Sequence, residues 1–471
     1  MPGYTEGTFV AVIINVLWIS VCAWILVEFI RRLNNSLIDN IGRLAFLLGF
    51  IFPANYFRVV FSVNEGTIHW VIDHPMITIP GGFLLTIFAL YLLIFRLKPV
   101  THFLSFILLI LSPFAVLTIG QAVWKIMVLQ KTSFGVGDIS YRTTTSSSRA
   151  VKQRVIWLMF DELDLRLTFL DVAEGMKFPE FGRFREQALF ALNAKSLVGG
   201  STAIAIPSYL MGKSAKNAIP ITSDALKLQF VGGDTGYFGR RTNNQTFFGE
   251  ARALGAKTAI IGYYHPYSRI FTEDYSFCSW YAVNTYTPQA TASVPTEMWS
   301  QLKGITPFFR RTNAIATYRG ILRDTLRVVV DPEYDLIYIH ASVPHGPNIY
   351  DEHSNGFSVL NISKRGYFSN LALADIFLGT LRRAMEEANL WEQTTILITS
   401  DHEWRFPYLY DGIRVRKVPF MLKMQSQNKQ LVYETPFYAT LVAKDLLLQV
   451  LTGNLNDPKE VINWLTKRKV E

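Results

Sequence analysis

Three clusters of acidic and imidazole side chains each follow a short apolar run. The run "VIWLMF" is followed by Asp161 and Glu162, and the run "TILITS" is followed by Asp401 and His402. A third run, "DLIYIH", leads to His345 in "ASVPHGP". Carboxylates together with imidazoles are ligands of a divalent metal such as Zn²⁺ or Mn²⁺. Each cluster alone could be a solvated strand end or a helix cap, but together they predict one shared metal site.

The stretch "LVGGSTAIAIPSYLMG" supplies a candidate nucleophile. Gly199 and Gly200 permit a tight approach of the chain, and Ser201 and Thr202 then open an apolar segment that we expect to be helical. Backbone N–H groups and the helix dipole stabilise an anion at a helix N-terminus, and a metal would lower the pKa of a hydroxyl held there. The alternative is that one of these hydroxyls only caps the helix.

The elements that position these side chains follow from the pattern around them. Apolar runs of strand length alternate with helical stretches, which predicts an α/β domain with a mostly parallel central sheet over residues 154–471. We expect buried parallel strands at 155–160, 258–264, 335–340, 395–400 and 418–424, and helices at 181–192 and 369–389. In such sheets the ligand crevice lies beyond the carboxyl ends of the strands, so the three clusters can converge there.

The first 130 residues predict a transmembrane helical domain. About four apolar segments lie there, at 9–30, 44–61, 77–95 and 103–120. A bilayer core requires about 20 apolar residues, and core helices of a soluble protein would need a polar face that these segments lack. The polar stretch 131–153 is a plausible juxtamembrane linker.

Basic residues indicate the orientation of these helices. Arg31, Arg32 and Arg43 flank the first connection, and Arg96 and Lys98 lie in the third, whereas the second has no Lys or Arg. By the positive-inside rule the N-terminus and everything after residue 130 lie outside the cytoplasm. The net charge of +9 suits anionic lipid headgroups. It indicates no nucleic-acid partner, because no dense basic patch interleaved with aromatic residues occurs.

The ordered motifs resemble a known family. "VIWLMFDELD", "FPEFGRFREQALFALNA", "GGSTAIAIPSYLMG", "VPHGP" and "ITSDH" occur in the order seen in the sulfatase-like branch of the alkaline phosphatase superfamily. The resemblance covers roughly residues 153 to 425, and the membrane segments look like those of phosphoethanolamine transferases and lipoteichoic acid synthases. It implies an alkaline-phosphatase-like fold with a bound divalent metal, Zn or Mn.

The resemblance also implies roles for single residues. Asp161, Glu162, Asp401 and His402 match its metal ligands. The nucleophile of the phosphoethanolamine transferases stands five residues before a proline, which in this sequence is Thr202 rather than Ser201. His345 matches a histidine that binds substrate or a second metal, and we expect it to bind a substrate phosphate or to protonate the leaving alcohol.

The sequence also departs from that family. Sulfatases carry Cys or Ser two residues before the proline and Arg two residues after it, where this chain has Ala205 and Tyr209. Formylglycine chemistry is therefore not available, which counts against sulfate ester hydrolysis. The transferases follow Asp-His with Gly-Glu-Ser and a later histidine, whereas this chain has "EWRFPYLYDGIRVRK" and no later histidine.

Cationic residues could compensate for the missing histidine. The candidates are Arg405, Arg414, Arg416 and Lys417, with a solvated basic loop as the alternative. Of these we assign Arg414 and Arg416 to substrate binding, together with His265, which follows an expected strand in "GYYHPYSR". We expect His340 to be structural.

These observations predict a metal-dependent phosphotransferase in the bacterial inner membrane, with several membrane passes and its catalytic domain on the periplasmic or extracellular side. It would move a phospholipid headgroup, such as phosphoethanolamine or phosphoglycerol, through a phospho-threonine to an envelope glycan or lipid. The alternative is a phosphodiesterase or sulfatase-like hydrolase with the same metal site. A third possibility is an inactive fold that serves as a scaffold in an envelope assembly.

Overall fold

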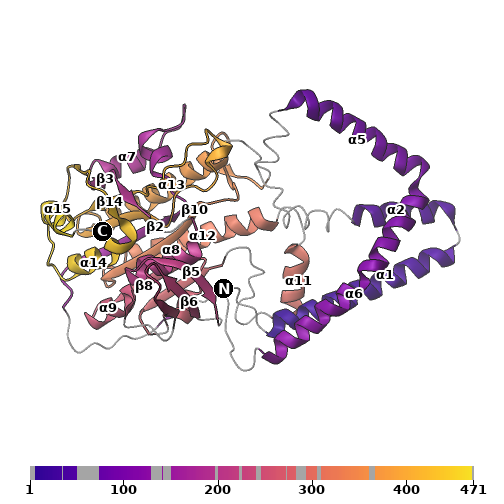
Figure 1. Cartoon of the computed structure of the whole chain (residues 1–471), viewed down its shortest axis with the longest axis horizontal. Helices are drawn as coiled ribbons and strands as arrows, with labels where there is room; N and C mark the ends of the chain where they lie inside the picture. Colours follow the sequence, from indigo (N-terminus) through magenta and orange to yellow (C-terminus); the bar gives the residue numbers. More distant parts are fainter. Residues whose placement is uncertain are drawn as a thin grey trace. The chain divides into compact units, whose positions relative to one another are not determined.

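The computed structural model of the chain divides into two units (Figure 1). One, here called the helical unit, comprises Tyr4–Gly135 and Tyr286–Arg310, and the other, the α/β unit, comprises Met1–Gly3, Val136–Thr285 and Arg311–Glu471. The structure describes residues 6–33, 35–49, 74–128, 140–141, 150–196, 200–221, 225–239, 245–271, 273–282, 293–304, 309–359 and 366–468.

The helical unit contains five described helices. They are α1 (Glu6–Leu33), α2 (Ser36–Gly49), α5 (Pro75–Phe95), α6 (Leu97–Val128) and α11 (Val294–Gly304). Within them, Gly7–Phe29 and Leu97–Trp124 are long and apolar enough to cross a membrane. Most of their large apolar side chains are exposed in the chain by itself, as expected for helices that lipid would cover.

We expected about four membrane spans, and the described helices include two that are long and apolar enough. The apolar part of α5, Pro75–Tyr91, is shorter than a full span. The predicted segment 44–61 begins inside α2, and residues 50–61 lie outside the part of the chain that the structure describes. Helix α2 is amphipathic rather than uniformly apolar, since Asp39 and Arg43 form an ion pair on it.

Helix α11 joins the helical unit although it lies far along the chain. The side-chain amide of Asn15 in α1 donates to the carbonyl oxygen of Met298 at 3.1 Å and to Oε1 of Gln301 at 2.9 Å. Gln301 in turn donates to the carbonyl oxygen of Thr8 at 2.9 Å. The division into units thus differs from the predicted boundaries, which place all of 154–471 in one catalytic domain, because these contacts tie residues 286–310 to α1.

The α/β unit is built on a sheet in the order β1-β9-β8-β10-β2-β13-β14-β3-β15. Its described strands are β1 (Ser140–Tyr141), β2 (Arg154–Asp161), β3 (Leu189–Ala191), β8 (Thr258–Tyr263), β9 (Phe277–Tyr281), β10 (Leu336–Pro344), β13 (Thr394–Ser400), β14 (Phe420–Lys423) and β15 (Leu431–Tyr433). The pairs β9–β8, β8–β10, β10–β2 and β2–β13 are parallel. The predicted mostly parallel sheet is confirmed.

Helices and smaller sheets complete this unit. The helices are η1 (Arg166–Leu170, a π-helix), α7 (Pro179–Arg185), α8 (Thr202–Met211), α9 (Phe247–Ala253), α10 (Tyr267–Ile270), α12 (Phe309–Val329), α13 (Gly366–Glu387), η3 (Pro407–Leu409), α14 (Ala439–Leu451) and α15 (Pro458–Lys467). The remaining strands are β4 (Ala194–Lys195), β5 (Ala215–Pro220), β6 (Ala225–Phe230), β7 (Thr235–Gly239), β11 (Tyr350–Asp351), β12 (Gly356–Phe357) and β16 (Phe437–Tyr438).

Strand β2 is buried on both faces of the sheet. Its residues alternate between two buried clusters, because successive side chains of a strand point to opposite faces. Trp157 packs with residues of α8, α9 and α14 on one face. Leu158 and Phe160 pack with residues of α7, α12 and α13 on the other. A strand buried on both faces reads as the continuous apolar run seen in the sequence.

Two predicted elements differ from the structure. The run 418–424 contains β14, but β14 is antiparallel to β13 rather than parallel. The prediction was wrong because an apolar run carries no information about strand direction. The helix predicted over 181–192 ends at Arg185, and Leu189–Ala191 form β3 between β14 and β15. Here strand pairing in the sheet overrides local helix propensity. The predicted linker 131–153 contributes β1, which pairs with β9, and most of its other residues lie outside the described segments.

Candidate active site

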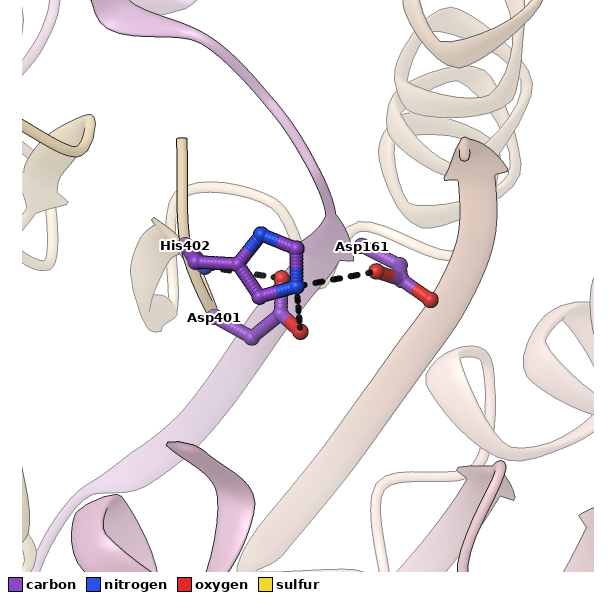
Figure 2. A group of neighbouring side chains, drawn as sticks. All are labelled: Asp161, Asp401 and His402. Atoms are coloured by element: carbon purple, nitrogen blue, oxygen red, sulfur yellow. Dashed lines mark hydrogen bonds and ion pairs between the residues drawn. The ribbon is translucent and has the colours of Figure 1, made fainter. Parts of the chain in front are cut away.

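Asp161, Asp401 and His402 meet at the carboxyl ends of two neighbouring strands. Parallel pairing of β2 with β13 places Ser400 opposite Phe160, so the residues that follow each strand emerge side by side. One ligand atom from each of the three lies within 4.8 Å of the others, and all three side chains are buried (Figure 2). Nε2 of His402 lies 3.3 Å from Oδ2 of Asp401 and 3.9 Å from Oδ1 of Asp161.

Thr202 lies beside the same three residues, but it is positioned by helix α8 rather than by a strand end. Helix α8 begins at Thr202 after an extended Ser201 and a left-handed Gly200 with φ of 73°. The Thr202 hydroxyl lies 3.5 Å from Oδ1 of Asp161, to which it donates, and 3.4 Å from Nε2 of His402. The first amides of a helix have no acceptor within the helix, so the Thr202 hydroxyl lies at a positive helix end.

The electrostatics of the cluster favour a cation. Burial raises the pKa of Asp161 well above its ordinary value, and the neighbouring carboxylates of Asp401 and Glu162 raise it further. Burial acts in the same sense on Asp401, but the imidazoles of His402 and His340, together with the hydrogen bond from the Glu162 amide, lower the pKa of Asp401. Two carboxylates this close in a buried site repel each other unless a positive charge lies between them.

The residues present fit a divalent metal. Two carboxylates and an imidazole form a donor set that suits Zn²⁺ or Mn²⁺. Nδ1 of His402 lies 2.9 Å from the carbonyl oxygen of Glu403, so an N–H there fixes the tautomer and leaves Nε2 as a ligand atom. Oδ2 of Asp401 is buried and accepts no hydrogen bond from the described residues. Asp161, Asp401 and His402 would hold the ion.

Glu162, predicted as a further metal ligand, has a different partner. Its backbone is left-handed, with φ of 66°, and its amide donates to Oδ1 of Asp401 at 3.0 Å. Its buried carboxylate is bonded to the guanidinium of Arg405, and it is not part of the three-residue metal group. With this backbone conformation the carboxylate pairs with Arg405, in the loop that follows β13.

His345 contacts Arg405 rather than standing free to transfer a proton. Its amide donates to the carbonyl oxygen of Asp161 at 3.0 Å, which fixes the residue beside the cluster. Nδ1 lies 2.6 Å from the carbonyl oxygen of Gly346, and Nε2 accepts from Nη2 of Arg405 at 2.7 Å. Burial lowers the pKa of His345. A neutral ring whose lone pair already accepts a hydrogen bond orients Arg405, and the expected role of general acid has no free proton behind it.

Arg414 approaches the nucleophile from the same loop as Arg405. Its guanidinium bonds the buried carboxylate of Glu403, with Nη2 at 2.7 Å. A Cβ on Gly200 would lie 3.4 Å from Nη2 of Arg414 and 3.2 Å from Cγ of Arg405. Both arginines therefore flank the residue that leads into Thr202, and a larger residue than glycine would crowd them. Arg416, the other predicted cation, is an exposed side chain on this loop.

His265 and His340 contact backbone carbonyl oxygens near the site. Nε2 of His265 is 3.4 Å from the carbonyl oxygen of Thr202, so the ring contacts the backbone of α8 rather than the hydroxyl. Burial lowers the pKa of His265 to about 3, and the ring packs against Phe238 and Tyr264. This position argues against the predicted substrate contact. His340 is bonded through Nδ1 to the carbonyl oxygen of Tyr263 at 3.0 Å, in a structural position as expected.

From the sequence, Glu162 was assigned to the metal and Glu403 was not singled out, so both carboxylate partners of the arginines went unpredicted. Each acid directly follows a predicted ligand, and the available signal was the presence of two arginines, Arg405 and Arg414, in the loop after β13. Tyr264 was also missed. It follows β8 with a left-handed φ of 72°, and its ring is half-buried near Asp161, which together with burial raises its pKa. A non-glycine residue in that conformation is strained, and such residues often occur at functional sites.

Comparisons with known proteins give matches in structure only. No protein-family model and no curated protein sequence matches the chain. Among solved structures, the chain is similar to BT1596, a 2-O GAG sulfatase, with 11% identity over 66% of this chain and 72% of that one and a TM-score of 0.42. It is similar to the phosphonate monoester hydrolase SpPMH from Silicibacter pomeroyi, with 12% identity over 65% of this chain and 78% of that one and a TM-score of 0.39.

A third solved structure is described as a protein in the alkaline phosphatase superfamily from Vibrio parahaemolyticus. The identity is 12% over 66% of this chain and 69% of that one, with a TM-score of 0.40. The solved structures that the chain is similar to thus include members of the superfamily that its motifs resemble.

Proposed function

We propose that the protein is a metal-dependent phosphotransferase that moves a phospholipid headgroup through a phospho-threonine. One observation carries the proposal: the Thr202 hydroxyl lies at a helix N-terminus, within 3.5 Å of both Asp161 and His402. This arrangement combines a nucleophile, a cation site and helix amides around the position that a phosphoryl group would occupy.

The bond changes centre on Thr202, and two arginines bind the phosphate. The Thr202 oxygen forms a bond to phosphorus, and the bond from phosphorus to the lipid's glycerol oxygen breaks. The proton that Thr202 gives up ends on the released alcohol. Arg405 and Arg414 bind the non-bridging phosphate oxygens, a task suited to their forked donors. In the second half-reaction an acceptor hydroxyl attacks phosphorus and Thr202 recovers its proton.

A bound divalent ion would supply positive charge beside the developing phosphoryl charge and lower the pKa of the Thr202 hydroxyl. Glu162 and His345 hold the guanidinium of Arg405 from two sides. Their part is to orient a cation that substitutes for the histidine absent from the last segment of the site.

The membrane setting supports a lipid donor and an envelope glycan or lipid acceptor. Two apolar helices long enough to span a bilayer would keep enzyme and donor in one plane. The orientation predicted from basic residues, with the α/β unit outside the cytoplasm, completes the proposal.

The test uses the full chain in detergent with a phospholipid that carries ³²P in its headgroup phosphate. After a quench with acid, label should remain on the wild-type chain and be found on Thr202 by peptide mass analysis. The Thr202→Ala variant should retain no label, and Thr202→Ser should retain some. Absence of label on the wild-type chain, with turnover still observed, would contradict the covalent step.

A hydrolase remains the second candidate, because the solved structures similar to this chain include a sulfatase and a phosphonate monoester hydrolase. The same experiment separates the two. Label transferred to an added glycan or lipid supports the transferase, whereas release of free headgroup phosphate alone, with Thr202 still labelled, supports hydrolysis.

A further inference from the structure

Five large apolar side chains are exposed on two segments of the α/β unit, and we call them the apolar rim. One segment is the loop after β13, and the other comprises the last residue of η1 and the residues that follow it. They are Tyr408 (59% exposed), Ile413 (54%), Leu170 (51%), Tyr410 (47%) and Val172 (40%). Burying such side chains is favourable, so a group of them left in water indicates a surface that something else covers.

A nearly buried arginine holds the two segments of the rim together. Nη1 of Arg166, in η1, lies 2.6 Å from Oδ2 of Asp411 and 2.6 Å from Oδ2 of Asp171. Nη2 donates to Oδ1 of Asp411 at 3.0 Å and to the carbonyl oxygen of Ile413 at 3.2 Å. Because four contacts converge on one guanidinium, the rim side chains are held at the surface by a defined structure rather than by a loose loop.

The rim is continuous with the active site through the loop itself. Residues 404–414 carry both Arg405 and Arg414 as well as three rim residues. Trp404, at the start of the loop, stacks on Tyr367 at 4.2 Å between ring centroids, and the Tyr367 hydroxyl donates to the carbonyl oxygen of Glu162 at 2.7 Å. A molecule whose phosphate reaches the two arginines would therefore bring its remaining parts close to the rim.

We propose that the apolar rim inserts into the surface of a phospholipid bilayer and delivers the lipid phosphate to Arg405 and Arg414. The proposal rests on the proposed function, because it names how that lipid substrate is reached. Tyrosines and aliphatic residues beside arginines form the composition that favours the lipid–water interface. The exposed side chains of Arg414 and Arg416 complement the phosphates of the headgroups.

The size of the rim favours a lipid surface over a protein partner. A stable protein interface takes roughly 20–30 residues from each partner, whereas the rim offers five apolar side chains. Partial insertion of a few such side chains, with help from basic residues, is sufficient for reversible membrane contact.

The first experiment measures membrane contact without using activity. The full chain carries Cys22→Ala, because Cys22 is exposed and Cys278 is buried, and Ile413→Cys receives a nitroxide label. In nanodiscs of phosphatidylethanolamine and phosphatidylglycerol, the label at 413 should be more accessible to oxygen than to a water-soluble nickel chelate. A label at Val432→Cys, an exposed position on β15, serves as the control and should show the reverse. Equal accessibility at the two positions would overturn the proposal.

The second experiment separates lipid access from chemistry. The variant Tyr408→Ser/Tyr410→Ser/Ile413→Ser should raise the KM for vesicle phospholipid at least about tenfold, a change of about 1.4 kcal/mol. It should leave turnover of the soluble diester bis(p-nitrophenyl) phosphate unchanged, as should the control Val432→Ser on both substrates.

Other outcomes are also decisive. Equal loss on lipid and on soluble diester would mean that the rim residues only support the loop, and the proposal would fail. Protection of the label that depends on protein concentration would assign the rim to a second copy of the chain, which also overturns it. If wild-type protein turns over neither substrate, the proposed function fails, and the nitroxide result still decides membrane contact.

Discussion

The ion pair between Arg405 and Glu162 gives the sharpest prediction, because stability and activity should respond to it differently. Arg405→Gln leaves the buried Glu162 carboxylate without its cation. Removing one partner of a buried pair costs about 3–5 kcal/mol. Since the Arg405 side chain is 33% exposed, solvent screens part of this, and we expect a loss of about 2 kcal/mol. For a unit of this size that lowers Tm by about 4 °C.

Adding Glu162→Gln should restore most of that stability, because the unpaired charge is removed. Activity should not return, since the phosphate still lacks a charge-assisted hydrogen bond that contributes about 1.5–3 kcal/mol. We therefore expect kcat/KM to stay roughly 10-fold to 100-fold below wild type in the double variant. Arg405→Lys should rescue activity poorly, because an ammonium lacks the fork that bonds Glu162 and His345 together.

The assay is a double-mutant cycle on full-length, metal-loaded protein in detergent, followed by tryptophan fluorescence during heating and by turnover of a soluble diester. A coupling free energy below about 0.5 kcal/mol between positions 405 and 162 would show that the pair is not formed. Recovery of activity in the double variant would refute a substrate role for Arg405.

Three further predictions concern charge and packing. In metal-free protein at pH 8, Asp161→Asn should melt higher than wild type, because a buried carboxyl whose pKa is raised destabilises the folded state as pH rises; thermal unfolding after chelation checks this. Burial raises the pKa of Asp375 to about 6, so the free energy of unfolding of the wild type should fall by up to about 3 kcal/mol as the pH rises from about 4 to about 6. Melting curves across that range should show a weaker pH dependence for Asp375→Asn. Gly262→Ala would place a Cβ 2.1 Å from the Tyr267 ring and should destabilise by about 3 kcal/mol, whereas Gly182→Ala, in open space, should not; Tm values compare the two.

The parts of the fold that sequence predicted best are those encoded locally. The strands that carry Asp161 and Asp401 are continuous apolar runs, and burial on both faces of a parallel sheet requires such runs. The glycine turn before an apolar helix indicated Ser201 or Thr202 as the nucleophile, and the resemblance to the phosphoethanolamine transferases then favoured Thr202. In each case a short segment contains its own signal, and parallel pairing then brings the carboxyl ends of the strands together.

What sequence could not predict depends on contacts between distant segments. Glu162 and its partner Arg405 lie more than 200 residues apart in the sequence, so no local pattern connects them. The left-handed backbone of Glu162 also could not be predicted, because such a conformation is usually signalled by a glycine. Residues 189–191 pair as a strand because β14 and β15 lie on either side of them. The length of α7 therefore depends on neighbours that no local pattern reveals.

The docking of α11 on α1 affects how the protein could be separated into parts. The chain passes between the two units near residues 135, 285 and 310, so a single proteolytic cut after α6 would not release the α/β unit while α11 still held α1 through Asn15. A secreted form would need α11 removed as well, or it would carry into water a helix whose Glu297 is normally buried. Release of the α/β unit by one proteolytic cut is thus disfavoured by the path of the chain.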